Sequence, residues 1–372
     1  MDFLAERMTR QGLAARSMAT TAGVAAAAVG LQAQDPGAAR LGVRARSAAV
    51  NEAAVLDAVR LERSVVRTWL MRSTVHLVAA ADLRWMATLF GPMMERGYRT
   101  RWRQLGITEP LVDAAVPHVR ELLDGRGLTR RELAAELAAR GIRLGEDGQA
   151  ATHLLAALSA RGVTCRGWDQ GRDAAFVLID DWVGPPAGST AEPAPDSDTP
   201  PAPDSHPAPD SAGLAAELAR RYFRAFGPAT AADFTAWSGL PSGAAMAAIR
   251  DELTEVDFDG RRGWTLGRVE PSPGFRLLPM FDNYLIGYRD RTAMLDPRLH
   301  ARVYVGGIIK ATVVCDGRVI GLWRLDRTPR SATIRVTPFE PLTRRYAGEL
   351  DRERADIERF LGRPAGLDIE PG

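Results

Sequence analysis

The segment VGLQAQDP (Val29–Pro36) places two glutamines, Gln32 and Gln34, one residue apart between two apolar stretches. A glutamine side chain is neutral and cannot act as a general base at ordinary pH, but its carbonyl oxygen accepts a hydrogen bond and its amino group donates one. Two side chains at this spacing in an extended or turn segment can lie on one side of the chain. The pair is therefore either a neutral clamp for a water molecule or, alternatively, a pair of helix-capping or surface residues.

Two further segments supply side chains that suit contacts with phosphate groups. They are Arg67 and Arg72 in RTWLMRSTVHLV, and Arg289 and Arg291 at the end of LLPMFDNYLIGYRDR. His76, in the first of these segments, is a candidate to point toward DNA or its sugar. For His76, a packed and hydrogen-bonded histidine is an equally good interpretation.

Three other polar residues near these segments have simpler structural interpretations. Asp35 stands immediately before Pro36 and is better explained as a helix N-cap than as a base. Asp282 and Tyr284 are interpreted as hydrogen-bond partners that hold the surrounding structure.

No metal or cofactor site is predicted. Cys165 and Cys315 are the only cysteines, too few for a disulfide framework or a cysteine-based zinc site. The five histidines are scattered along the chain, so a metal site would have to be assembled from remote pieces.

Composition places the chain among soluble globular proteins: 46% of its 372 residues are hydrophobic and 25% are charged. The apolar run AGVAAAAVGLQA is far shorter than the roughly 20 residues of a membrane span, so we expect a cytoplasmic protein. The formal net charge is +2, but segment 185–213 contains acids and no Arg or Lys. The remainder is therefore more basic and suits a polyanion, although ordinary solubility charge is the alternative.

The clearest domain boundary is PPAGSTAEPAPDSDTPPAPDSHPAPDSAG, residues 185–213, in which APDS occurs three times. Pro, Ser and Asp without large apolar residues cannot bury enough surface to offset the entropy of ordering. We predict a disordered linker that acts as a spacer.

The elements around the linker repeat one order, in which helices are followed by a β-hairpin, as in a winged helix. The first unit, 1–110, has helices expected at 20–30, 36–48 and 51–62, a hairpin over 65–79 turning near Arg72–Ser73, and a long helix from Asp82. The second unit, 111–184, has helices at 127–141, with a Thr129–Glu132 capping box, and 149–162, then a hairpin over 163–180. The third unit, 214–270, has three helices, the last (242–256) a candidate recognition helix, and a hairpin near 256–266.

Residues 271–372 change to strands, predicted at 275–290, 302–317, 318–330 and 331–339, with an Asp316–Gly317 hairpin turn. A charged amphipathic helix, 343–362, closes the chain. The predicted fold class is thus α+β: three tandem winged helix-turn-helix units followed by a C-terminal antiparallel β-barrel-like domain.

Five segments together resemble the AlkZ-like (AlkZ/YcaQ) winged-helix DNA glycosylase family. VGLQAQDP resembles its catalytic Gln-x-Gln segment, and RTWLMRSTVHLV its Arg-x-Trp-x-x-Arg-Gly-Thr-x-His block, with Ser73 in place of the usual glycine. GPATAADFTAWSGL, LLPMFDNYLIGYRDR and CDGRVIGLW are similar to later motifs in the same order. The resemblance extends over most of the chain except the linker, which is unusually long for the family.

The resemblance implies an enzyme that excises N7-alkylated purines, including bulky adducts or interstrand cross-links, from double-stranded DNA. Such a base already carries a positive charge, so the enzyme need not protonate it. What remains is to place a water beneath C1′ and to stabilise an oxocarbenium-like sugar. Gln32 and Gln34 are then the catalytic pair. Relatives with Asp at the second position have a true base there, and slower hydrolysis of simple adducts is a consequence of this difference.

We expect a cofactor-free, nucleoid-associated protein that acts as a monomer, because a chain of several such units can embrace DNA alone. Some members of the family protect antibiotic producers from their own DNA-alkylating product, and the resemblance suggests this role here. Glycosylases that also cleave the DNA backbone usually need an amine for a Schiff base. Lys310 is the only lysine, so Lys310 and the N-terminus alone offer such an amine, and we predict a monofunctional glycosylase without lyase activity.

Two alternatives remain open at this point. A non-enzymatic winged-helix transcription regulator would use the same helices and hairpins, and would bind one operator roughly 10³-fold or more tightly than random DNA. A catalytically silent relative would bind and shield adducts without releasing the base.

Overall fold

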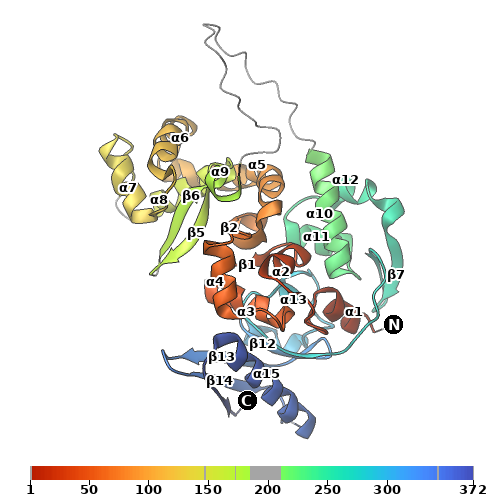
Figure 1. The fold of residues 1–372 in the computed structure, drawn as a ribbon. Helices are drawn as coiled ribbons and strands as arrows, with labels where there is room; N and C mark the ends of the chain where they lie inside the picture. Colours follow the sequence, from red (N-terminus) through yellow and green to blue (C-terminus); the bar gives the residue numbers. More distant parts are fainter. Residues whose placement is uncertain (1, 146–147, 172, 185–210, 342, 372) are drawn as a thin grey trace. The chain divides into compact units, whose positions relative to one another are not determined.

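The computed structural model describes residues 2–145, 148–171, 173–184, 211–341 and 343–371. The predicted linker lies outside the described residues, except for 211–213, which begin helix α10 (Ser211–Phe226). Helices and strands both occur throughout, which confirms the α+β class (Figure 1). The chain forms two compact units, Met1–Ala80 with Ala216–Gly372 and Ala81–Ala215. The finer division into five segments stays a prediction.

The N-terminal part of the first unit contains short helices and three short strands. In chain order these are α1 (Phe3–Arg10), α2 (Thr21–Ala27), β1 (Leu31–Gln32), α3 (Pro36–Arg46), α4 (Glu52–Arg60), β2 (Val65–Trp69) and β3 (Val75–Ala79). Strands β2 and β3 form the predicted antiparallel hairpin, and β1 pairs antiparallel with the other edge of β3. Helix α1 was not predicted. The other helices of this part agree with the sequence analysis.

Local capping residues explain where these helices begin. The Asp35 carboxylate accepts from the backbone N–H of Ala38 at 2.7 Å, and Pro36 occupies the first turn of α3. This confirms Asp35 as an N-cap. Asn51 caps α4 in the same way, accepting from the N–H of Ala54 at 2.8 Å.

The part of the first unit that follows the linker again orders helices before a hairpin. Its elements are α10, α11 (Ala231–Ser238), α12 (Ser242–Ala247), β7 (Thr254–Phe258) and β8 (Arg261–Thr265). The Thr230–Asp233 capping box forms at the start of α11. The candidate recognition helix is shorter than predicted, because α12 ends at Ala247 and a 3-10 turn (Arg250–Glu252) follows.

The C-terminal part is built on a five-stranded sheet in the order β15-β14-β13-β12-β9. Its elements are β9 (Phe275–Leu278), α13 (Asn283–Ile286), α14 (His300–Val303), β10 (Tyr304–Val305), β11 (Ile308–Ile309), β12 (Thr312–Cys315), β13 (Arg318–Arg327), β14 (Ala332–Pro338), α15 (Arg344–Leu361) and β15 (Ala365–Ile369). Strands β14 and β15 run parallel, and the other neighbours are antiparallel. Across the described residues, edge strands β15 and β9 do not pair. The sheet is therefore mixed and open, which corrects the prediction of an antiparallel barrel-like domain. Helix α15, blue in Figure 1, contacts strands β15 and β9 of this sheet.

Two further expectations for this part were wrong. Residues 275–290 were predicted as strands, but only β9 forms, and the chain then enters helix α13, capped by Asp282. A short apolar run such as YLIG does not distinguish a strand from a helix, and here the cap decides. The chain also does not close on α15, since β15 follows it and pairs with β14.

The second unit contains most of the long helix α5 (Ala80–Gln104), which the sequence analysis assigned to the first winged-helix unit. Its other elements are α6 (Glu109–Leu123), β4 (Leu128–Thr129), α7 (Arg130–Ala139), α8 (Gln149–Ala160), β5 (Thr164–Gln170), β6 (Asp173–Leu178) and α9 (Ile179–Val183). Thr129 and Glu132 form the predicted capping box. Strand β6 pairs antiparallel with both β5 and β4.

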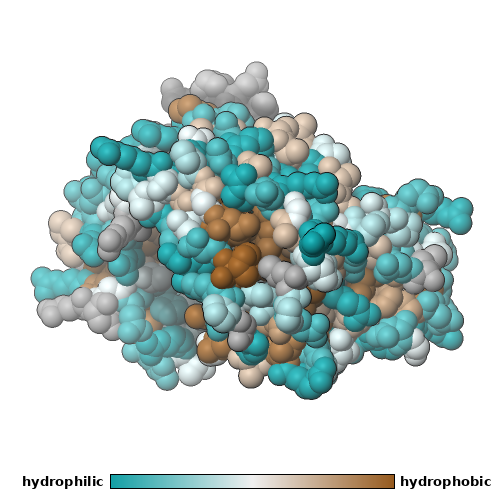
Figure 2. All heavy atoms as spheres, turned by 90° about the horizontal axis from the view of Figure 1, so that it is seen from below, coloured by the Kyte–Doolittle hydropathy of each residue, from teal (hydrophilic) through white to brown (hydrophobic). Residues whose placement is uncertain are grey.

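Figure 2 shows a face covered largely by hydrophilic residues, with hydrophobic atoms gathered near its centre. Of the helices within the described ranges, none has the length and apolar character needed to cross a membrane.

Candidate active site

Gln32 lies on the short strand β1, directly opposite His76 on β3. Opposed residues of an antiparallel pair project from the same face of the sheet, with Cβ atoms about 5 Å apart. On β2, Thr68 opposes His76 in turn, so it belongs to the same row. The Gln32 side chain is half-buried, and within the described part of the chain its amide has no hydrogen-bond partner.

Gln34 follows on the same side of the chain and is exposed. Leu31 and Ala33 are buried, and the Ala33 N–H donates to the Val75 carbonyl at 2.7 Å, which keeps the segment paired with β3. The Gln34 carbonyl oxygen accepts from the Val75 N–H at 3.4 Å, a long and weak bond. The alternation of buried and accessible residues therefore places both glutamines on the accessible side, as the spacing predicts.

Asn283 fixes the turn from which the glutamine segment starts. Its side-chain NH₂ donates to the carbonyl of Ala28 at 3.0 Å and to that of Gly30 at 2.7 Å, and the residue is 3% exposed. Val29 and Gly30 both have positive φ angles, 54° and 86°. A non-glycine residue in this region is strained, and the two buried hydrogen bonds hold the strained turn in place. The sequence analysis missed this residue.

The residues on either side of Asn283 hold the start of α13 in place. Asp282 links it to helix α3, and Tyr284 links it to the turn between β12 and β13. Asp282 forms a bidentate ion pair with Arg46, with both N–O distances at 2.8 Å, and also caps α13. The Tyr284 hydroxyl donates to the Gly317 carbonyl at 2.9 Å. The structural interpretation of Asp282 and Tyr284 is thus confirmed.

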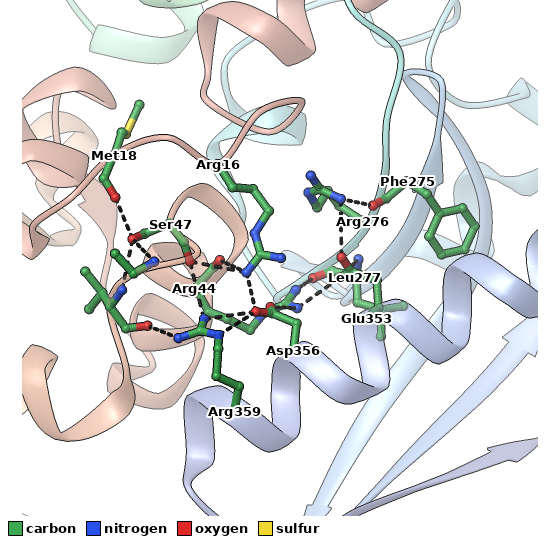
Figure 3. Close-up of polar contacts among 12 residues, drawn as sticks. Arg16, Met18, Arg44, Ser47, Phe275, Arg276, Leu277, Glu353, Asp356 and Arg359 are labelled. Carbon is green, nitrogen blue, oxygen red and sulfur yellow. Dashed lines mark hydrogen bonds and ion pairs between the residues drawn. The ribbon is translucent and has the colours of Figure 1, made fainter.

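A buried ion-pair network fixes the C-terminal end of α3 (Figure 3). Arg44, at 0% side-chain exposure, lies 2.9 Å from Glu353 and 2.9 Å from Asp356, both on α15. Burial alone would lower the pKa of Arg44, but the two carboxylates raise it above its ordinary value. Burial likewise favours the neutral form of Asp356, yet Arg44 and Arg16 hold the pKa of this acid below its usual range. The network is therefore charged, and it keeps α3, which follows the glutamines, in position.

His76 is 2% exposed and neutral at physiological pH. Burial, followed by the positive charge of Arg72, lowers the pKa of His76 to about 3. Its Nδ1 lies 3.0 Å from the Thr74 carbonyl oxygen, which can only accept, so Nδ1 carries the proton. The Nε2 atom is then a hydrogen-bond acceptor on the face that holds Gln32. The structure thus shows a packed, hydrogen-bonded histidine opposite Gln32, and its role toward DNA or the sugar stays a prediction.

Arg72 and Arg291 are brought together by the fold. Arg72 lies in the turn between β2 and β3 (Met71–Ser73), and Arg291 follows α13. Burial, and then the like charge of Arg291, lower the pKa of Arg72 to about 10. Ser73 has a φ of 57°, a left-handed conformation that explains the glycine usual at this position of the resembling motif.

The two other predicted phosphate contacts lie elsewhere. Arg67 opposes Leu77, not His76, so its side chain projects from the opposite face of the hairpin, where it is buried at 5% exposure. Arg289 is exposed, and its backbone N–H donates to Asp233 in the capping box of α11 at 2.8 Å. Within the described ranges, neither arginine side chain has a recorded contact with Gln32 or Gln34.

The chemistry of this site is that of neutral hydrogen-bonding groups beside cations. Across the described ranges of the chain, no group of three or more His, Cys, Asp or Glu side chains is placed to hold a metal ion. The nearest carboxylate in sequence, Asp35, is engaged as a helix cap. The arrangement can position a water molecule and bind an anion.

The chain is similar in sequence and in structure to known DNA glycosylases. The family described as DNA glycosylase AlkZ-like matches residues 25–360. An interstrand DNA cross-link repair glycosylase from Streptomyces sahachiroi is 31% identical over 382 residues, covering 97% of this chain and 96% of that protein. The solved structure of Streptomyces sahachiroi DNA glycosylase AlkZ superposes with a TM-score of 0.77 at 28% identity, covering 100% of this chain and 98% of that one.

Proposed function

Because the chain belongs to the AlkZ-like DNA glycosylase family, we propose that it is a monofunctional glycosylase for N7-alkylated purines in double-stranded DNA. The supporting observation is that Gln32 and Gln34 lie on the accessible side of a rigidly held segment, with a neutral histidine opposite the first of them. The name of the 31% identical relative extends the proposal to bulky adducts and interstrand cross-links.

In the proposed reaction the alkylated base leaves with its own positive charge neutralised, so no residue has to protonate it. The carbonyl oxygen of one glutamine accepts a hydrogen bond from the attacking water, and the second glutamine orients that water or faces the developing positive charge on the sugar. The C1′–N bond breaks with its electron pair on the base, the water oxygen bonds to C1′, and the water's excess proton passes to solvent. Neutral amides lower the barrier by orientation and by their dipoles, which cost no reorganisation during the reaction.

His76 contributes as a neutral acceptor. Its proton is committed to the Thr74 carbonyl, so Nε2 can accept from the Gln32 amino group or from the water. Because its pKa is about 3, the ring remains neutral through the physiological range. A neutral ring beside the sugar avoids repulsion with the oxocarbenium-like transition state.

We infer that the helix-hairpin successions of the chain act as three winged helices that bind the duplex. Arg72, Arg291 and exposed Arg289 serve as phosphate contacts. We assign no DNA contact to Arg67, since it is buried on the other face of its hairpin. The enzyme would act as a monomer at the nucleoid, where its substrate is, and protection from a self-made DNA-alkylating product is a role consistent with this chemistry.

A lesion panel tests the proposal. Purified protein is incubated with duplexes carrying N7-methylguanine, a bulky N7-guanine adduct and a nitrogen-mustard cross-link, and released base is measured by chromatography. The proposal predicts release from at least one of them, leaving an abasic site that is cleaved only after alkali. Release from none would refute it, and sequence-specific binding to one operator would favour a regulator.

A further inference from the structure

Arg72 is a half-buried cation without a counter-charge. Within the described residues it makes no hydrogen bond and no ion pair, and its Nη1 atom is buried without a partner. The fully buried arginines of the same unit differ: Arg44 and Arg46 pair with carboxylates, and Arg7 donates to the Pro228 carbonyl at 2.9 and 2.7 Å. An unpaired buried guanidinium is expensive, so its retention calls for an anion from outside the chain.

The backbone holds Arg72 in this position. Its φ of 52° and ψ of 26° are left-handed, and Ser73 after it has a φ of 57°. Two consecutive non-glycine residues in this conformation are strained, and such strain accumulates at binding sites. A type I′ hairpin turn requires this conformation at both central residues, and here Arg72 occupies one of them with its side chain only partly exposed.

A second cation lies near enough to Arg72 for its charge to lower the pKa of Arg72, and it contacts a tyrosine. The Arg291 guanidinium lies over the Tyr304 ring, 5.2 Å from its centroid, while its Nε donates to the Leu285 carbonyl. No described residue accepts from the Nη atoms of Arg291. The Tyr304 hydroxyl is itself buried without a partner, and the ring stacks on His300 with centroids 4.4 Å apart. Burial raises the pKa of Tyr304 to about 12, so its hydroxyl is a donor at neutral pH.

These groups form a set of donors that lacks an acceptor. Arg72, Arg291 and Tyr304 come from the β2–β3 turn, the loop after α13 and the start of β10. A tetrahedral oxyanion offers several acceptor oxygens and a negative charge, so one such group can satisfy two guanidiniums and a hydroxyl together. Arg72 also lies close enough to His76 to influence its charge state, and His76 opposes Gln32. The anion would therefore lie beside the proposed reaction centre.

We propose that Arg72, Arg291 and Tyr304 together bind a single phosphodiester group of the DNA backbone next to the lesion, and thereby set the sugar over Gln32 and Gln34. The proposal rests on the proposed function, and it names these three as positioning residues that act through the phosphate. The glutamines carry no charge and form no ion pair with the DNA. The bound phosphate therefore fixes the position of C1′ relative to the two glutamines.

The salt dependence of binding to undamaged duplex DNA tests whether the two arginines share one phosphate. Each phosphate contact contributes about 0.9 to the slope of log K against log salt concentration. Arg72→Gln, Arg291→Gln and the double variant should each lose about one contact, because all three abolish the same one. The Arg352→Gln control removes an equal charge from exposed α15 and should leave the slope unchanged. A double variant that loses twice the slope of either single variant would overturn the shared site.

Chemical substitution of the DNA locates the phosphate and needs no catalysis. A lesion duplex is made with one neutral methylphosphonate at a time near the damaged nucleotide, and binding is measured. Wild-type protein should lose affinity at one position, by roughly 10-fold, and Arg72→Gln should be insensitive there. Tyr304→Phe should weaken binding to the unmodified duplex and reduce the loss caused by the methylphosphonate at that position, without changing the salt slope. Equal sensitivity of the wild type and both variants at every position would refute the proposal.

Inorganic phosphate tests whether the site binds a free phosphate ion instead of the DNA backbone. If millimolar phosphate raises the melting temperature of the wild type but not of Arg72→Gln, while the DNA measurements are unaffected by the substitution, the site takes free phosphate and the DNA assignment is wrong. A methylphosphonate footprint in a protein that releases no base would uphold this site and refute the glycosylase function instead.

Discussion

Replacing Asn283 should uncouple the glutamine segment from the fold. Asn283→Ala removes two buried hydrogen bonds and leaves the carbonyls of Ala28 and Gly30 without their donor. A buried group left unsatisfied costs about 1–3 kcal/mol, so we expect unfolding to become easier by about 2–4 kcal/mol. The strained turn at Val29–Gly30 should then relax, and a displacement near 1 Å in the reacting geometry lowers the rate by about 100-fold.

The assay combines urea denaturation with single-turnover base release from an N7-methylguanine duplex. Asn51→Ala is the matched control: it removes an exposed helix cap, which should cost about 1 kcal/mol and leave base release unchanged. Asn283→Asp should behave like Asn283→Ala, because a carboxylate cannot donate to two carbonyls. Unchanged base release in both Asn283 variants, or an equal loss in Asn51→Ala, would refute the reasoning.

Three further outcomes are expected. Because the pKa of His76 is lowered to about 3 from an ordinary 6.5, its contribution to stability is complete above pH 6.5 and is lost as pH falls towards 3. The loss is about 1.4 kcal/mol per pH unit, and His76→Gln should flatten the curve between pH 4 and 6; an equal slope in both proteins would contradict it. Because the pKa of Arg72 is lowered to about 10, its charge destabilises the folded state at pH 7 by up to about 3 kcal/mol. Arg72→Gln should therefore raise the melting temperature while weakening DNA binding, whereas Arg46→Gln, which breaks a buried ion pair, should lower it. Lys310→Ala should keep full base release, and borohydride should trap no covalent DNA complex; a trapped complex that disappears in Lys310→Ala would show lyase chemistry.

Much of the local structure was predictable, because its causes are local. The capping boxes at Thr129 and Thr230 begin the helices that the sequence indicates. The Asp316–Gly317 turn has positive φ angles at both residues, 48° and 83°, as its hairpin type requires.

Other features were not predictable, because they depend on contacts between distant parts of the chain. The apolar run after Pro279 is compatible with strand or helix, and only the Asp282 cap selects α13. Closure of a sheet depends on whether its edge strands meet, which hydrophobic alternation does not specify. In the described part of this sheet β15 pairs with β14 and becomes the edge strand, and it does not pair with β9 at the other edge.

In the candidate site, too, local features were predictable and long-range contacts were not. The spacing of Gln32 and Gln34 predicts that they share one side of the chain, and the structure agrees. Their neighbours are set by pairing of β1 with β3 and by Asn283, far away in sequence. The polar pair Asp282–Asn283 inside an apolar run was the available signal, since buried polar residues need partners. It does not say which partners.

The central claim is that two neutral glutamines carry the hydrolysis. Its most direct test is single-turnover base release by Gln32→Ala with Gln34→Ala, measured beside affinity for the same lesion duplex. Gln104→Ala, which removes an exposed glutamine from the end of α5, is the control. The account predicts that the double variant loses base release by at least about 100-fold while its affinity changes less than about threefold, because neither side chain carries charge. Base release at the wild-type rate in the double variant would contradict it.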